Sequence, residues 1–98
     1  MTVDELPARV AHAVHALMYA SLPSGGGETG PFTAAEVCVY DAHWEAITPR
    51  HTAAALREAQ KLGLCVYVPP GYWTPTNRAL EQRRRFDDRF ARDQEAEG

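Results

Sequence analysis

The N-terminal part of the chain has the hydrophobic pattern of one helix that is followed by a loop. Apolar residues recur at helical spacing over residues 6–18, whereas residues 23–31 are rich in glycine and proline. We therefore expect a first helix that ends near Ser21, with Asp4 available as its N-cap and Pro7 in its first turn. The loop after it lacks the Gly-Lys-Ser/Thr ending of a phosphate-binding loop, so we do not expect it to bind a nucleotide.

A capping box marks the start of a second helix. In Thr33-Ala34-Ala35-Glu36, the hydroxyl and the carboxylate can each accept from a main-chain N–H group that lacks a partner at the helix start. The pattern predicts a helix from there to about Tyr40 or His43, with a very short strand at residues 30–32 before it. Residues 41–47 are compatible with either a longer second helix or a turn.

A threonine followed by a proline marks the start of a third helix. Thr48 can cap this helix, and Pro49 can occupy its first position, where no N–H group is needed. The helix is expected to reach about Leu62, and Gly63 suits the left-handed residue that ends it.

The two faces of this third helix differ in character. Thr52, Leu56 and Ala59 share one side, which we expect to pack toward the core. The opposite side is then left for solvent or a partner, and it carries Arg50, Ala54, Arg57 and Lys61.

Two short runs of strand-forming residues predict a β-hairpin. Residues 64–68 and 72–74 flank Pro69-Pro70-Gly71. Pro75 limits the second strand, which is therefore expected to be a short edge strand. A last helix is predicted from about Asn77, with Ala79, Leu80, Phe86 and Phe90 as its apolar positions. We expect this helix to end in an acidic tail without regular structure at about residues 91–98.

Four local motifs occur in a characteristic order. Residues 32–37 form the capped start of a helix, residues 47–59 a second capped helix, Gly63-Leu64 a junction into a hairpin, and residues 73–81 a strand that runs into a helix. In this order the chain resembles the winged-helix superfamily of transcription regulators, most closely the MarR-like small regulators, over roughly residues 8–86. The resemblance implies a fold that is mainly α with a small β-hairpin (α+β). Its expected order is helix, short strand, helix, helix, strand, wing, strand, helix, as in a winged helix-turn-helix.

The chain is short enough to form one domain. At 98 residues, with 45% hydrophobic and 23% charged residues, it has the size and composition of a single soluble fold. We expect one domain over residues 1–98, with its core at about residues 8–86.

No apolar run is long enough to span a membrane, no secretory leader is visible, and the two cysteines lack CxxC spacing. We therefore expect a cytoplasmic protein with reduced, buried thiols at Cys38 and Cys65.

The charges are segregated along the chain, although the formal net charge is only −3. Residues 30–86 contain seven basic and five acidic residues, whereas acidic residues crowd the C-terminal end. This mild basic excess permits DNA binding without requiring it. Arg83-Arg84-Arg85 could form a phosphate patch, or a solvated surface that pairs with Asp87 and Asp88.

The resemblance places the N-terminal half of the third helix in the major groove of DNA. Arg50 and His51 are then the best candidates to read base edges, because an arginine can pair bidentately with guanine. Thr48 or Thr52 could hydrogen-bond a phosphate, and the alanines offer little beyond contact with a thymine methyl group. Alternatively, Thr48 only caps the helix, Thr52 is half-buried and Arg50 is solvated. The full predicted DNA-binding set is Thr48, Arg50, His51, Thr52, Ala54, Arg57, Lys61 and Arg78.

No residue spacing indicates catalysis or a bound metal. His12 and His15 lie one helical turn apart, but no third ligand nearby completes a recognised spacing. Neither a Ser-His-Asp nor a Cys-His arrangement can be inferred, and no carboxylate pair suggests acid–base chemistry. We expect no enzyme activity, no cofactor and no metal site.

The predicted function is double-stranded DNA binding by a small transcriptional regulator. The alternative is a winged-helix adaptor that binds proteins, because the net charge is acidic and the predicted wing tip carries no Lys or Arg. Tyr67, Tyr72 and Trp73 could pack at least one ring in the core or form a contact surface for such a partner.

A homodimer is also predicted, because regulators of this kind often pair to contact two successive major grooves. Its expected interface is the last helix, where Leu80, Phe86 and Phe90 are apolar. The competing interpretation folds Phe86 and Phe90 back onto the first helix of the same chain.

Overall fold

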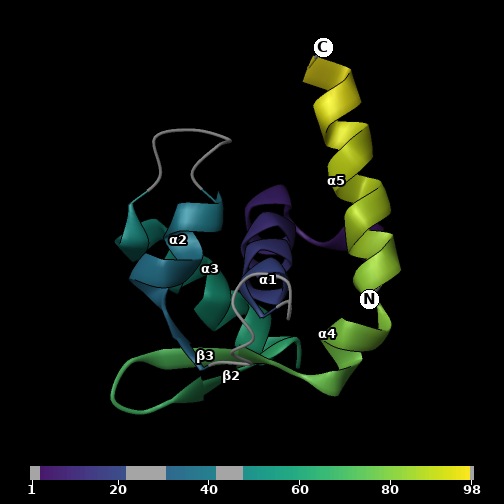
Figure 1. Ribbon diagram of the computed structural model, residues 1–98. Helices are drawn as coiled ribbons and strands as arrows, with labels where there is room; N and C mark the ends of the chain where they lie inside the picture. The colour runs from purple at the N-terminus through teal and green to yellow at the C-terminus, as the bar shows by residue number, and fades with distance from the viewer. Residues whose placement is uncertain (1–2, 22–30, 42–47, 98) are drawn as a thin grey trace.

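The computed structural model describes residues 3–21, 31–41 and 48–97 (Figure 1). These residues form a mainly helical structure with a small antiparallel sheet of three strands, which confirms the predicted α+β class. The predictions for the glycine-rich loop and for residues 42–47 concern parts of the chain outside these ranges. In chain order the elements are η1 (Val3–Glu5), α1 (Ala8–Ala20), β1 (Phe32–Thr33), α2 (Ala34–Asp41), α3 (Pro49–Lys61), β2 (Cys65–Val68), β3 (Tyr72–Pro75), α4 (Asn77–Glu81) and α5 (Arg83–Glu97).

The first helix, α1, begins later than its hydrophobic pattern suggested. Pro7 is its N-cap residue, no side chain caps it, and Asp4 lies in η1. The prediction of Asp4 as the N-cap is wrong because the η1 turn, in which Leu6 N donates to Val3 O (3.2 Å), separates Asp4 from α1. Pro7 likewise precedes the first turn instead of lying in it.

None of the helices in the described ranges is long and apolar enough to cross a membrane.

The second and third helices start where their capping residues predicted. Glu36 N donates to Thr33 Oγ1 (3.2 Å), and Thr33 N donates to Glu36 Oε1 (3.1 Å), so the capping box is confirmed. Thr48 Oγ1 accepts from His51 N (3.3 Å) at the start of α3. After α3, Gly63 has a φ of 77°, the left-handed conformation that side chains other than glycine rarely adopt.

The predicted hairpin is present, but its second strand is central in the sheet. The strand order is β1-β3-β2, so the expectation that Pro75 marks an edge strand is wrong. β1 has only two residues, which lie opposite Trp73 and Tyr72. Because β1 does not extend alongside Pro75, which lies opposite Cys65 of β2, the missing N–H group of the proline is tolerated at this end of a central strand.

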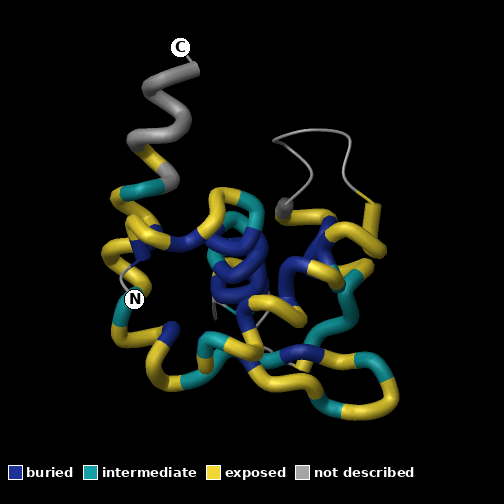
Figure 2. Tube along the Cα trace, turned by 180° about the vertical axis from the view of Figure 1, so that it is seen from behind, coloured by how far each residue is buried: buried dark blue, intermediate teal, exposed yellow. Residues whose placement is uncertain are grey.

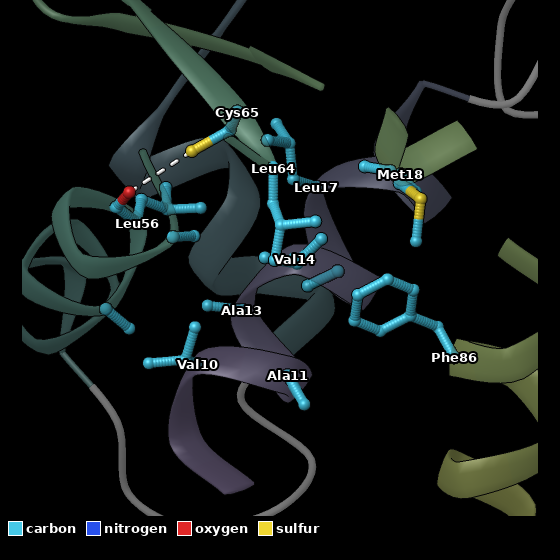
Figure 3. Close-up of a cluster of buried hydrophobic side chains, with 14 of the residues drawn as sticks. Val10, Ala11, Ala13, Val14, Leu17, Met18, Leu56, Leu64, Cys65 and Phe86 are labelled. Carbon is cyan, nitrogen blue, oxygen red and sulfur yellow. Dashed lines mark hydrogen bonds between the residues drawn. The ribbon is translucent and has the colours of Figure 1, made fainter. Parts of the chain in front are cut away.

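The hydrophobic core is built around α1. Figure 2 shows the buried residues gathered along this helix in the middle of the molecule, and α2, α3, β3 and α5 all contact it. In the core, Val14 and Leu17 of α1 lie between Leu56 of α3 and Phe86 of α5 (Figure 3). The side of α3 that carries Thr52, Leu56 and Ala59 is buried, as predicted.

The C-terminal part forms two helices instead of one helix that fades into a tail. Gln82 separates α4 from α5, and its φ of −93° and ψ of 5° fall outside the helical region. α5 then continues to Glu97, so the expectation that the chain loses its helical structure near residue 91 is wrong. Most residues of this segment have good helix propensity, which favours its continuation.

The burial of Phe86 overturns its expected role as an anchor for a homodimer. Its side chain is 2% exposed and belongs to the core cluster of its own chain, as the competing interpretation proposed. Leu80 is 46% exposed, and the side chain of Phe90 lies outside the described part of the structure. The last helix is thus fixed to its own α1 by the residue that was expected to bind a second copy.

Candidate nucleic-acid interface

The exposed side of α3 carries a row of three basic side chains and one alanine, which we call the α3 stripe. It consists of Arg50, Ala54, Arg57 and Lys61, all of which are exposed. At about 100° of rotation per residue, the four positions lie within roughly 60° of one another around the helix axis, opposite the buried face. At about 1.5 Å per residue, Arg50 and Lys61 are separated by about 16 Å along the helix. The structure therefore confirms that these four predicted residues share one accessible face.

The N-terminal end of α3 is also accessible. Thr48, Pro49, Arg50 and His51 are all exposed. The Thr48 hydroxyl oxygen accepts from His51 N, so its own proton is still available to donate to another acceptor. Since the helix dipole places partial positive charge at this end, an anion near Thr48 would be favoured by both the hydroxyl and the helix.

Thr52 must be removed from the predicted DNA-binding set. It is 0% exposed and lies on the buried face of α3, where Arg9 Nη2 donates to its Oγ1 atom (3.4 Å). Helical periodicity places Thr52 opposite the stripe, and α1, which carries Arg9, packs against that side. A phosphate outside the protein cannot reach a hydroxyl that is buried between two helices.

Glu58, which is not among the predicted site residues, modifies the charge of the stripe at its C-terminal end. Lys61 Nζ lies 3.1 Å from Glu58 Oε1, and both side chains are well exposed. The spacing of three residues is a signal that could have predicted this pair. Exposed pairs of this kind contribute little energy, so Lys61 remains available to exchange Glu58 for another anion.

Arg78 lies at the C-terminal end of α3 although it belongs to α4. Its Nη1 atom donates to the main-chain oxygen of Leu62, the C-cap residue of α3 (3.2 Å). The structure thus brings Arg78 to the same end of α3 as Lys61, but one of its donors is already engaged within the protein.

The hairpin beside α3 presents an uncharged surface. Residues 62–77 contain no Asp, Glu, Lys or Arg, and the tip residues Pro69 and Pro70 are exposed. Val66, Tyr67 and Tyr72 are exposed hydrophobic residues. Trp73 is 3% exposed and packs in the core, so the expectation that at least one ring of this cluster is buried is confirmed.

Other reactive side chains of the described residues have structural partners. The Cys65 thiol donates to Leu56 O (3.1 Å), and burial raises its pKa to about 12 (Figure 3). A thiol with this pKa stays protonated at neutral pH, so Cys65 is a poor nucleophile. His15 Nε2 lies 2.8 Å from Asp87 Oδ1 and links α1 to α5. Within the described ranges, no group of three His, Cys, Asp or Glu residues could hold a metal ion.

Comparison of the chain with protein-family models, with curated proteins and with solved structures finds no match. The geometry and chemistry of the α3 stripe are therefore the basis of its proposed function.

Proposed function

We propose that this chain is a winged-helix protein that binds double-stranded DNA by inserting α3 into the major groove, and that it acts as a small transcriptional regulator. The observation that carries this proposal is the α3 stripe, in which three basic side chains share the exposed face of a helix whose other face is buried. An α-helix fits the major groove of B-DNA, and basic side chains along it can contact both phosphates and base edges.

The arrangement of the elements supports the winged-helix assignment. A two-residue strand precedes two capped helices, and an antiparallel hairpin follows them and pairs with that strand. In a helix-turn-helix protein, the second helix of such a pair is the one that enters the groove. This is α3, the helix that carries the stripe.

The residues near α3 divide into two proposed roles. Arg50 and His51 lie at its N-terminal end and are assigned to base edges, where Arg50 can donate two hydrogen bonds to guanine. Arg57, Lys61 and the Thr48 hydroxyl are assigned to phosphates, which fix the register without reading sequence. Ala54 has no long side chain, so the stripe can approach the base edges closely at its middle.

The uncharged hairpin favours a second candidate function, the binding of a protein. Val66, Tyr67 and Tyr72 are exposed within 16 residues that lack charge, whereas a hairpin that contacts phosphates normally carries basic residues. In the proposed DNA-binding mode, the hairpin supplies no basic side chain, so α3 must supply the phosphate contacts that a basic hairpin would otherwise share.

We expect Arg50→Ala to weaken binding to a selected duplex by about 1 to 3 kcal/mol, which is the value of one bidentate contact with a base. The duplex is first selected from a randomised-sequence library with the unmodified protein, and its affinity is then measured by fluorescence anisotropy. The melting temperature should hardly change, because Arg50 is exposed.

Gln60→Ala is the matched control, since Gln60 is exposed on α3 but lies outside the stripe. It should leave the affinity for the selected duplex nearly unchanged. Equal affinities for the Arg50→Ala variant and the unmodified protein would show that Arg50 does not read a base.

A further inference from the structure

The two chain segments at the base of the hairpin are tied together by three hydrogen bonds. Residues 62–64 connect α3 to β2, and Thr76 connects β3 to α4, whose first turn contains Arg78. Thr76 Oγ1 donates to Gly63 O (2.7 Å), Thr76 N donates to Leu64 O (3.2 Å), and Arg78 Nη1 donates to Leu62 O (3.2 Å). Each of the three consecutive carbonyl groups after α3 therefore accepts from the segment that leaves the hairpin.

We call these three bonds the hairpin clasp, and its two side chains are those of Thr76 and Arg78. The local environment of each side chain favours the bond that it makes. The Thr76 hydroxyl donates to Gly63 and accepts from Ala79 N (3.3 Å), so it caps α4 and fastens the base of the hairpin at once. The Arg78 guanidinium lies against Gly63, where an added Cβ atom would be 3.5 Å from Nη1. A cation is also favoured there, because the last carbonyl groups of α3 lack partners within the helix and carry partial negative charge.

We propose that the clasp fixes the orientation of the hairpin relative to the α3 stripe, and that Arg78 is a positioning residue of the proposed DNA interface instead of a phosphate contact. The first half of this statement concerns the protein alone, and the second rests on the proposed function. The strand that enters the hairpin is tied to α3 by other bonds, because the Cys65 thiol donates to Leu56 O and Leu64 N donates to Ala59 O. The clasp ties the segment that leaves the hairpin to the end of α3, next to Gly63, whose backbone has no side chain to restrict it.

The orientation of the hairpin can be tested without DNA by a distance measurement between two nitroxide labels. Gln60→Cys on α3 and Gly71→Cys at the hairpin tip provide the attachment sites, because Gln60 is exposed and an added Cβ atom at Gly71 meets nothing within 4 Å. The native thiols of Cys38 and Cys65 are buried, and a sample without the added cysteines checks that they stay unlabelled.

In this measurement, Arg78→Ala and Thr76→Val should broaden the distance distribution. Arg78→Lys should restore it in part, because a lysine can still donate one hydrogen bond to Leu62 O. Thr76→Ser keeps the hydroxyl and should leave the distribution narrow. An unchanged distribution in both Arg78→Ala and Thr76→Val would overturn the clasp.

The salt dependence of DNA affinity separates positioning from phosphate contact. The plot of log affinity against log salt has a negative slope. With a randomised duplex, loss of one phosphate contact makes this slope shallower by about 0.9. Arg78→Ala should weaken binding by roughly three- to tenfold at every salt concentration with an unchanged slope, as expected for loss of one hydrogen bond to a main-chain carbonyl. A slope that is shallower by about 0.9 would instead show that Arg78 contacts a phosphate, and it would overturn the assignment of Arg78 as a positioning residue.

The two arms of the test fail in different ways. If the unmodified chain does not bind the duplex at any salt concentration, the proposed function and the assignment of Arg78 to a DNA interface are both overturned. The distance measurement then still decides whether the clasp fixes the hairpin. A broad distribution in the clasp variants together with normal DNA affinity would mean that hairpin orientation does not affect binding, and would overturn the positioning role.

Discussion

Phe86→Ala is expected to lower the free energy of unfolding by about 3 to 5 kcal/mol, the range for removing a buried aromatic ring. The ring is 2% exposed and projects from α5 into the core beside Val14 of α1 (Figure 3). Among the described side chains of α5, Phe86 is the only buried one, so its loss leaves a cavity between α5 and α1. Urea unfolding followed by circular dichroism would measure the change.

Leu80→Ala is the control for this variant, because Leu80 is 46% exposed on the neighbouring α4. It should cost less than about 1 kcal/mol. Light scattering on both variants adds a second readout, which bears on the homodimer that the sequence predicted. A Phe86→Ala variant that keeps its stability but changes from a dimer to a monomer would contradict the placement of Phe86 in its own core.

Leu56→Ala should lower the free energy of unfolding by about 2 to 5 kcal/mol, through lost burial and a cavity between α3 and α1. Leu56 is 0% exposed, and its main-chain oxygen accepts from the Cys65 thiol at the start of the hairpin. The substitution thus removes packing at the point where α3, α1 and β2 meet. Chemical unfolding in urea is again the measurement.

Thr33→Ala is the comparison for Leu56→Ala. It removes the capping hydroxyl of α2 and should lower the free energy of unfolding by about 1 kcal/mol. Thr33→Ser should cost less, because it retains the hydroxyl that Glu36 N uses. If Leu56→Ala were no more damaging than Thr33→Ala, the buried face assigned to α3 would be wrong.

The features that the sequence predicted well depend on residues close together in the chain. The capping box of Thr33 and Glu36, the Thr48 cap and the left-handed Gly63 each need only a few neighbouring residues. The two faces of α3 follow from helical periodicity alone, so most of the stripe was also predictable. The Pro69-Pro70-Gly71 turn between two runs of strand formers likewise required no knowledge of distant contacts.

Three incorrect predictions depend on contacts between distant segments, whereas the misplaced N-cap at Asp4 results from the local η1 turn. Thr52 has a side chain suited to phosphate, but α1 covers it. Phe86 is equally apolar whether it binds a second chain or its own α1, and only the path of α5 distinguishes the two. Pro75 can lie in a central strand because β1 is too short to reach it.

The hairpin clasp was not predictable for the same reason. Thr76 precedes a helix and so has a local signal as an N-cap, but its bond to Gly63 spans the whole hairpin. The charge of Arg78 is visible in the sequence and places this residue in the predicted DNA-binding set. Its bond to Leu62 O, which suggests a different role, is visible only in the structure.

The most direct test of the proposed function compares two triple variants that lose the same charge. One replaces Arg50, Arg57 and Lys61 of the stripe with glutamine. The other replaces Arg83, Arg84 and Arg85, which are exposed at the start of α5 on the other side of α1 (Figure 1). Both variants change the net charge by three, so any difference between them reports where the DNA binds.

The measurement is the affinity for randomised duplex DNA across a series of salt concentrations. The proposed function predicts that the stripe variant loses binding at low salt. Its slope of log affinity against log salt should become shallower by about 1.8, at about 0.9 for each of the two phosphate contacts assigned to Arg57 and Lys61. The α5 variant should keep nearly the affinity and the slope of the unmodified protein. Equal losses in the two variants, or no salt-dependent binding by the unmodified chain, would contradict the assignment of α3 as a DNA-binding helix.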